Sequence, residues 1–255
     1  MSKYLYKPTL DDRERVRPRS DKLKVSGDGV FATLQGEGIT SGLPAVFLRL
    51  HFCNLRCRWC DTKYTWDITK KEFWQEPEDW SYEETAAKII DTWNSVFFNE
   101  IERRLVITGG EPLLQQRKIV KLLQKLPGWE IEIETNGTIL PLPDLYTCQF
   151  NCSPKLSNSG NILNIRYKPK VLRLINELPK SQFKFVVTSP FDLDEVSKII
   201  KECNLNVKKV LIMPEGRTKE EVETNLNLVR KEVKKRGWRI TLRNQLLWFG
   251  PKRRT

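Results

Sequence analysis

From about residue 44 onward, the chain alternates between two patterns of apolar positions. Short runs rich in β-branched and aromatic residues predict strands, and longer runs with apolar residues three or four positions apart predict amphipathic helices. The predicted strands span residues 44–52, 104–108, 130–135, 146–152, 183–187 and 209–213. The predicted helices span residues 113–126, 171–178 and 193–203, and two more begin after Ser81 and Thr218. Residues 238–248 are expected to be extended.

Two of these helices carry strong start signals. Ser81-Tyr82-Glu83-Glu84 and Thr218-Lys219-Glu220-Glu221 are capping boxes, in which the Ser or Thr side chain accepts a hydrogen bond from an otherwise unpaired backbone N–H. The second helix is expected to run to about Arg236 and to end at Gly237.

The repeated strand–helix units predict parallel strands joined by crossover helices, and therefore an α/β fold. About six such units can form an open sheet or a partial barrel, and both bind ligands at the carboxyl ends of the strands. Several small-residue turns fall at those ends: Gly109-Gly110, Asn136-Gly137, Ser153-Pro154 and Pro214-Glu215-Gly216. We therefore expect a ligand site along that edge of the sheet.

The chain of 255 residues fits one large domain. Residues 1–24 lack a periodic apolar pattern and are predicted to be a polar N-terminal extension, with residues 25–255 forming the domain. No apolar run approaches the roughly 18–20 residues that span a bilayer. The first 24 residues are also too charged for a signal peptide. A cytoplasmic protein without a membrane partner is expected, and its six cysteines then belong to a reducing compartment.

The formal net charge of +12 raises the question of an anionic partner. The lysines are scattered over predicted helices, as on an ordinary solvated surface. Arginines alternate from Arg13 to Arg19, and Lys252-Arg253-Arg254 lie near the other end. Neither tail has the interleaved aromatic residues of a base-stacking surface, so nucleic acid is not expected as a partner.

Cys53, Cys57 and Cys60 form a C-x3-C-x2-C pattern on one short loop. A structural zinc site usually takes four ligands, and a fully protein-ligated 4Fe–4S cluster takes four cysteines. Three thiolates can hold three irons of such a cluster and leave the fourth iron open to a ligand. A zinc knuckle with a distant fourth ligand, or buried thiols, are the alternatives.

Trp59 completes the pattern C-x3-C-x-(aromatic)-C, which resembles the signature of the radical S-adenosylmethionine superfamily. Thr108-Gly109-Gly110-Glu111-Pro112 resembles the motif of that superfamily's second strand, which binds the methionine amino group of the cofactor. Glycines suit such a contact because backbone can approach a ligand closely there.

Further motifs narrow the resemblance to the 7-carboxy-7-deazaguanine synthase family. These are Leu34-Gln35-Gly36-Glu37-Gly38, Cys60-Asp61-Thr62, Glu134-Thr135-Asn136-Gly137, Ser153-Pro154-Lys155 and Leu246-Leu247-Trp248, with Arg49 four residues before Cys53. The resemblance covers about residues 25 to 250. It implies a partial (β/α)6 TIM-type barrel. One departure is Asn244, near the position where the family usually has a histidine.

The resemblance also implies roles for individual residues. Cys53, Cys57 and Cys60 would ligate the cluster and act in catalysis. The residues implied for S-adenosylmethionine are Gly110, Asn136, Ser153, Pro154 and Lys155. Those implied for the pterin substrate are Leu34, Gln35, Gly36, Arg49 and Thr108. Thr62 would bind Mg²⁺, which prefers hard oxygen ligands.

The chemistry of these residue types agrees with the implied roles. Arg49 can hold a carboxylate with two hydrogen bonds, and Gln35 offers both a donor and an acceptor to a pterin edge. Taken alone, Arg49 is equally compatible with a surface charge, and Thr62 more often caps a turn than binds a metal. His51, the only histidine, is expected to be a core or loop residue, and as a hydrogen-bond donor it could tune the cluster. Cys148, Cys152 and Cys203 are predicted to be buried thiols.

The implied activity is the conversion of 6-carboxy-5,6,7,8-tetrahydropterin to 7-carboxy-7-deazaguanine with loss of ammonia, in 7-deazapurine (queuosine) biosynthesis. The implied cofactors are a 4Fe–4S cluster, S-adenosylmethionine and Mg²⁺. The implied partners are an electron donor such as flavodoxin or ferredoxin and a second copy in a homodimer. A glycyl-radical activase and a zinc-knuckle RNA-binding protein are the alternatives.

Overall fold

The computed structural model describes residues 5–98, 101–250 and 252–254. Within these residues, nine strands form one sheet in the order β3-β1-β2-β4-β5-β6-β7-β8-β9. The strands are β1 Leu23–Leu34, β2 Pro44–Leu50, β3 Glu78–Trp80, β4 Arg104–Gly109, β5 Glu130–Thr135, β6 Gln149–Cys152, β7 Ser181–Val187, β8 Val210–Pro214 and β9 Arg239–Ile240. From β2 to β9 all neighbours are parallel, and β1 runs antiparallel to β2 and β3.

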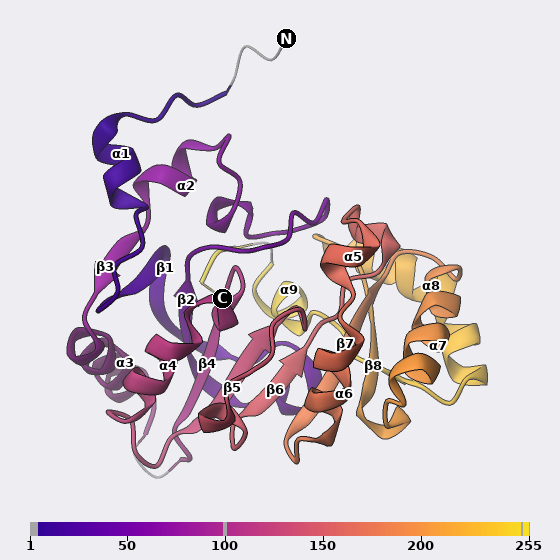
Figure 1. The fold of residues 1–255 in the computed structure, drawn as a ribbon. Coiled ribbons are helices and arrows are strands. Elements are labelled where there is room, and N and C mark those ends of the chain that lie inside the picture. Colours follow the sequence, from indigo (N-terminus) through magenta and orange to yellow (C-terminus); the bar gives the residue numbers. More distant parts are fainter. Residues whose placement is uncertain (1–4, 99–100, 251, 255) are drawn as a thin grey trace.

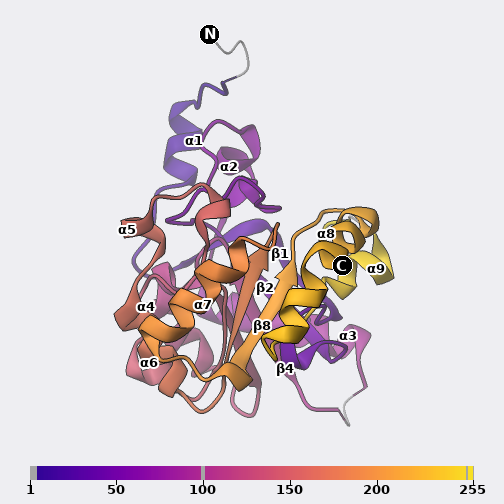
Figure 2. The ribbon, with the colours of Figure 1, turned by 90° about the vertical axis from the view of Figure 1, so that its right-hand side faces the viewer.

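Helices α3, α4, α6, α7 and α8 lie along the outside of this sheet (Figures 1 and 2). The α-helices are α1 Leu10–Arg15, α2 Lys71–Gln75, α3 Tyr82–Val96, α4 Gln116–Leu123, α5 Leu163–Arg166, α6 Pro169–Glu177, α7 Asp192–Cys203, α8 Lys219–Lys235 and α9 Asn244–Phe249. Short 3-10 turns are η1 Gly38–Thr40, η2 Lys63–Thr65, η3 Pro112–Gln115, η4 Pro143–Leu145, η5 Ser157–Ser159 and η6 Val207–Lys209. Helix α3 packs on β1 and β2, α6 and α7 on β7, and α8 on β8 and β9.

This arrangement confirms the predicted α/β partial barrel. The parallel strands follow one another in chain order, and the described strands leave β3 and β9 as the two ends of an open sheet. Both predicted N-caps are present. Ser81 accepts from the backbone N–H of Glu84, and Thr218 accepts from that of Glu221.

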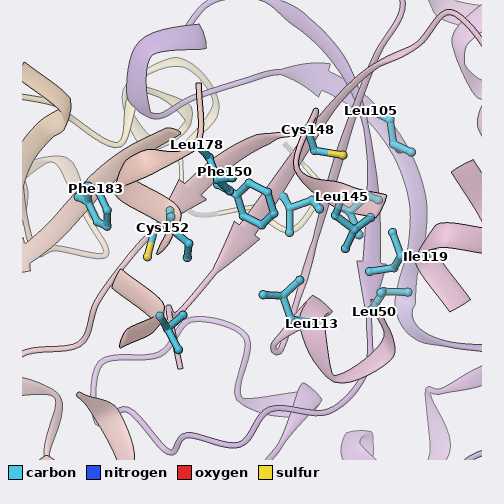
Figure 3. Close-up of a cluster of buried hydrophobic side chains, with 14 of the residues drawn as sticks. Leu50, Leu105, Leu113, Ile119, Leu145, Cys148, Phe150, Cys152, Leu178 and Phe183 are labelled. Atoms are coloured by element: carbon cyan, nitrogen blue, oxygen red, sulfur yellow. The ribbon is translucent and has the colours of Figure 1, made fainter. Parts of the chain in front are cut away.

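The core lies between the sheet and the outer helices. Side chains alternate between the two faces of a strand, so one residue in two of each parallel strand faces the helices. Figure 3 shows Phe150 and Phe183 there, packed with leucines from neighbouring elements. Cys148 and Cys152 are buried in the same cluster, and Cys203, the last residue of α7, is also buried. The prediction that these three thiols are buried is confirmed.

Two predictions about the chain ends differ from the structure. Residues 238–248 were expected to be extended, which is wrong beyond Arg239–Ile240, because α9 begins at Asn244. The reason is tertiary: the backbone N–H of Asn244 donates to Gly36 O at 3.0 Å, which turns the chain back over the site.

Near the other end, α1 and the twelve-residue strand β1 were not predicted. Gly27 and Gly29 lie within β1. The register of β1 against β2 shifts between Val25 and Val30, so the glycines lie at an irregularity inside the strand.

Candidate active site

A cavity of about 270 Å³ opens at the carboxyl ends of the parallel strands. All the residues predicted to bind cluster, cofactor, substrate or Mg²⁺ line it, with the exception of Pro154: Leu34, Gln35, Gly36, Arg49, Cys53, Cys57, Cys60, Thr62, Thr108, Gly110, Asn136, Ser153 and Lys155. Pro154 is buried beside it. The fold therefore gathers residues from distant parts of the sequence around one space.

Each of the three cysteine sulfurs accepts an N–H hydrogen bond. Cys53 Sγ accepts from the backbone of Leu55 at 3.5 Å, Cys57 Sγ from Asn161 Nδ2 at 3.3 Å, and Cys60 Sγ from Trp66 Nε1 at 3.2 Å. Such bonds stabilise thiolate charge and tune an iron–sulfur centre.

The donor set fits a 4Fe–4S cluster. Among the described residues, no three His, Cys, Asp or Glu side chains converge closely enough to hold a single metal ion. The three sulfurs instead line one cavity, which suits a cluster that distributes its ligands over several irons. Burial raises the pKa of the Cys53 thiol to about 12, so a cation at the sulfur is needed to hold it as thiolate.

Gly109 and Gly110, at the end of β4, are required by the protein's own packing. Gly109 has φ +130°, and a Cβ there would lie 2.0 Å from Leu50 O. A Cβ on Gly110 would lie 1.9 Å from Phe52 O. The ends of β2 and β4 approach too closely for any side chain, and this contact places the cysteine loop beside β4.

Side-chain hydrogen bonds join Asn54 of the cysteine loop to the residues that follow β5. Asn136 Nδ2 donates to Asn54 Oδ1 at 2.9 Å, Asn54 Nδ2 donates to Thr138 Oγ1 at 2.8 Å, and Thr138 Oγ1 donates to Asn136 Oδ1 at 2.6 Å. The fully buried Glu111 accepts from the backbone N–H of Asn136 at 2.7 Å and from Thr135 Oγ1 at 2.8 Å. Sequence reasoning missed the roles of Asn54, Thr138 and Glu111, although Glu111 belongs to a recognised motif.

The turn after β6 presents a cation to the cavity. Lys155 Nζ donates to Ser153 Oγ at 2.8 Å and lies 5.3 Å from the centroid of the Trp59 ring. Lys155 also lowers the pKa of Cys57, against the larger effect of burial, which raises it. The lysine charge thus lies within electrostatic reach of the cysteine loop.

Arg49 and Thr108 are direct neighbours in the register of β2 and β4. The Arg49 guanidinium lies 5.6 Å from the Phe31 ring centroid, a cation–π contact that orients it. Gln35 is buried, and its Nε2 lies 3.3 Å from Glu132 Oε2 and 3.4 Å from Glu134 Oε1. Its side chain is therefore held in place by carboxylates inside the barrel.

The Thr62 hydroxyl is not used as a cap. Thr62 precedes η2 without a side-chain capping bond, and its Oγ1 lies 3.5 Å from Cys60 Sγ. The hydroxyl therefore stays at the cavity wall, next to the cysteine loop.

An ionic network that sequence reasoning missed lines one part of the cavity. Lys184 Nζ, on β7, pairs with Glu37 Oε2 at 2.7 Å and Glu134 Oε2 at 2.8 Å. Burial opposes the charge on Glu37, but Lys184 and Arg243 outweigh it and lower its pKa to about 2. Burial raises the pKa of Glu134. The one feature of the sequence that could have indicated this network was Lys184 itself, a lysine between two phenylalanines in a predicted strand.

The C-terminal segment closes one side of the cavity, and sequence reasoning missed the roles of Arg243 and Gln245 in it. Arg243 forms a salt bridge with Asp61, which follows Cys60, and its Nε lies 3.5 Å from Glu37 Oε1. Gln245 Nε2 donates to Glu37 Oε1 at 2.8 Å. Asn244 Nδ2 donates to Ser41 Oγ at 2.8 Å, so the residue at the departure from the family pattern anchors this segment.

His51 is a core residue, as predicted. It is fully buried, with ring centroids 4.8 Å from Phe52 and 4.7 Å from Phe73. Burial, followed by the nearby charge of Lys24, lowers its pKa to about 3, so the ring is neutral at physiological pH.

None of the described helices is long and apolar enough to span a membrane.

Comparisons with known proteins agree with the geometry. The Radical SAM superfamily model matches residues 48–146. The 7-carboxy-7-deazaguanine synthase of Pyrobaculum aerophilum is 34% identical over 227 residues, covering 87% of this chain and 93% of the relative. That of Aquifex aeolicus is 32% identical over 231 residues, covering 87% and 91%. The crystal structure of QueE from Escherichia coli shares the fold, with a TM-score of 0.64 at 23% identity over 92% of this chain and 99% of that one.

The open parallel sheet with a three-thiol loop at its carboxyl edge defines a radical S-adenosylmethionine protein, which uses a 4Fe–4S cluster and S-adenosylmethionine. Within that superfamily, the extent of the similarity to the curated relatives narrows the assignment. The chain belongs to the 7-carboxy-7-deazaguanine synthase family.

Proposed function

We propose that the protein converts 6-carboxy-5,6,7,8-tetrahydropterin to 7-carboxy-7-deazaguanine with release of ammonia, in 7-deazapurine (queuosine) biosynthesis. The observation that carries the proposal is a single cavity lined both by the three thiols and by the residues expected to hold a pterin. Family membership supports the same reaction. When bound, the cluster and S-adenosylmethionine supply the radical chemistry.

In this proposal, Cys53, Cys57 and Cys60 hold the cluster. Gly110, Asn136, Ser153 and Lys155 bind S-adenosylmethionine, with Pro154 shaping their turn from behind the cavity wall. Asn54 and Thr138 act through Asn136, because their side chains fix its amide. These contacts set the position of the cofactor relative to the cysteine loop, which is the protein's main contribution to such a reaction.

On the substrate side, Arg49 binds the carboxylate with two charge-assisted hydrogen bonds, next to Thr108. Leu34, Gln35 and Gly36 contact the pterin ring. The carboxylate of Glu134, which lines the cavity, offers an acceptor to the N–H groups of the ring. Thr62 would supply a hydroxyl oxygen to Mg²⁺, and the ion would supply positive charge for the substrate carboxylate.

The closing segment favours a small substrate over a protein substrate. Arg243 and Gln245 line the cavity and tie the C-terminal segment to Glu37. A cavity covered in this way excludes water from the reacting atoms, whereas an activase must admit a segment of another protein. We further propose a homodimer in the cytoplasm. The division into an extension of residues 1–24 and one domain of residues 25–255 stays a prediction.

An anaerobic assay tests the proposal. The iron-loaded protein is supplied with reductant, S-adenosylmethionine, Mg²⁺ and the pterin, and the product is read by mass spectrometry. We expect 7-carboxy-7-deazaguanine from the wild type and a loss of at least about a thousandfold in Cys57→Ala, because the cluster loses a ligand. Cys203→Ala, a buried thiol remote from the cavity lining, is the matched control and should keep its activity. Formation of 5′-deoxyadenosine without this product would contradict the substrate assignment.

A further inference from the structure

A short segment that follows the cysteine loop contacts both ends of that loop. At the first end, Thr65 O accepts a hydrogen bond from the backbone N–H of Phe52 at 3.0 Å. At the other end, Trp66 Nε1 donates to Cys60 Sγ at 3.2 Å. We call residues 62–76, which include η2 and α2, the bracing segment. This segment holds the cysteine loop at two points.

Phe52, directly before Cys53, has a backbone conformation that needs this support. Its φ is +77°, in the left-handed region that a bulky side chain rarely adopts. The Phe52 N–H is held by Thr65, and its ring lies 6.3 Å from the ring of Phe73 on α2, measured between centroids. His51 packs against both rings. If the bracing segment moved away, Phe52 would relax and carry the first cluster cysteine with it.

Two arginines near the C-terminus contact the bracing segment from outside. Arg253 donates two hydrogen bonds to the carboxylate of Glu76, at 2.9 and 3.3 Å, and its guanidinium lies 4.0 Å from the centroid of the Tyr64 ring. Arg254 Nη2 donates to Gly27 O on β1 at 2.6 Å. A Cβ on Gly27 would lie 2.6 Å from Glu76 Oε2, so the glycine makes room for this carboxylate. Glu76 is therefore fixed between β1 and Arg253.

Residues near the N-terminus contact the same segment at α2. The backbone N–H of Tyr6 donates to Thr69 O at 3.3 Å, and Gln75 Nε2 donates to the Tyr6 hydroxyl at 2.8 Å. That hydroxyl donates in turn to Asp12 Oδ2 at 2.5 Å, and Asp12 is a buried residue of α1. Figures 1 and 2 both show α1 beside α2. The Tyr6 hydroxyl thus joins the two helices.

We propose that residues near both termini position the cysteine loop through the bracing segment, with Tyr6 and Arg253 as positioning residues of the active site. Neither side chain lines the cavity, so both act at a distance, through the contacts of Thr65 and Trp66 with the loop. The proposal goes beyond the proposed function. It requires the cluster that the three cysteines hold, but not a particular substrate.

The rate of iron release from the cluster-loaded protein tests the proposal. A ferrous chelator, bathophenanthroline, is added without oxygen, and the absorbance of its iron complex is followed. Arg253→Met removes an ion pair and a cation–π contact, which should let the bracing segment open more often. We expect iron release to be about threefold to tenfold faster. Tyr6→Phe keeps the ring but loses both hydrogen bonds of the hydroxyl, and release should be about threefold faster.

Arg236 offers a matched control. It also pairs with a carboxylate, Asp194 at 2.7 Å, and lies 5.3 Å from the ring centroid of Trp238, and none of these three residues lines the cavity. Arg236→Met removes the same kinds of contact from another part of the surface and should release iron at the wild-type rate. Arg253→Lys keeps a positive charge beside Glu76 and should bring the rate back toward that of the wild type.

The reduction potential of the cluster tests the route of the effect. The Trp66 N–H stabilises the reduced, more negative cluster through the sulfur of Cys60, so Trp66→Phe should lower the potential. Arg253→Met should shift the potential in the same direction. In the Trp66→Phe background it should add little, because the contact through which it acts is already lost. A potentiometric titration followed by electron paramagnetic resonance measures all four proteins. Equal shifts in the two backgrounds would contradict this route.

The other outcomes separate this proposal from the proposed function. The positioning role is wrong if Arg253→Met and Tyr6→Phe both release iron at the wild-type rate. It is also wrong if Arg236→Met accelerates release equally, because the effect would then reflect general stability. If the wild-type protein binds no iron, the cluster and the positioning role fail together. None of these measurements needs the pterin, so the positioning role can fail while the proposed function stands.

Discussion

The two faces of strands β5, β6 and β7 carry different kinds of side chain. The face toward the outer helices is apolar: Ile133, Phe150, Cys152, Phe183 and Phe185. The face toward the barrel interior carries charges and amides: the buried Glu132, Asn151, Gln182 and Lys184 and the partly buried Glu134. Both faces are buried, so burial alone does not distinguish them.

The difference shows what each face is for. TIM barrels commonly fill their interior with bulky aliphatic residues, which need no partners. Here every polar residue of the inner face requires a partner, and Asn151 Nδ2 alone bonds Glu132 at 2.7 Å and Glu134 at 2.9 Å. Such a network stabilises little in net terms, but it fixes the direction of each side chain. The outer face supplies stability, and the inner face positions the site.

The largest expected effect comes from removing the central cation of the inner face. Lys184→Met leaves the partly buried carboxylates of Glu37 and Glu134 without their shared partner. We expect a loss of about 3–5 kcal/mol in the free energy of unfolding, measured by urea unfolding followed by tryptophan fluorescence. Lys184→Arg keeps the charge and should lose less. Equal losses in the two variants would show that shape, and not charge, matters at this position.

A core residue on the outer face should behave differently. Ile133 is fully buried. In sequence it lies between Glu132 and Glu134, but its side chain is on the opposite face of β5. Ile133→Ala should cost about 2–5 kcal/mol through lost burial and a residual cavity. The KM for the pterin should not change in the protein that remains folded. A raised KM would mean that the two faces are coupled more tightly than proposed here.

The pH dependence of stability should be traceable to Glu37, which pairs with Lys184 of the inner face. The pKa of Glu37 is lowered to about 2 in the folded protein, from 4.5. Its contribution to stability is therefore present above about pH 4.5 and is lost as the pH falls toward 2. We expect roughly 2–3 kcal/mol of this kind, seen as a fall in urea midpoint between pH 5 and pH 3. Glu37→Gln should reduce the change of the urea midpoint between pH 5 and pH 3. An unchanged slope would show that other groups cause this pH dependence.

The smallest expected effect tests a feature remote from both faces. Ser81 caps α3 through the backbone N–H of Glu84 at 3.0 Å. Ser81→Ala should lower the free energy of unfolding by about 1 kcal/mol, and Ser81→Asp should restore it. Product formation at saturating substrate should be unaffected, because α3 supplies no residue to the cavity lining.

Sequence reasoning reached the site because its motifs are local. The cysteine loop, the glycines after β4 and the Ser153-Pro154-Lys155 turn each carry their chemistry within a few residues. Parallel strands place their carboxyl ends at one edge of the sheet. Once the strands were predicted, these turns could therefore be expected to lie close together. The same logic did not reach Lys184 or Arg243, because their partners lie far away in sequence and become neighbours only in the folded chain.

The sequence by itself determined the class of fold, the cluster loop and thirteen of the residues that line the cavity, because periodicity and short motifs depend on neighbouring residues. Only the tertiary structure decided that Glu37, Glu134 and Lys184 form one buried network and that the C-terminal segment folds back as α9 over Gly36. Both depend on long-range contacts. Buried charge requires a partner wherever the chain can supply one, and no local pattern records which residue that will be.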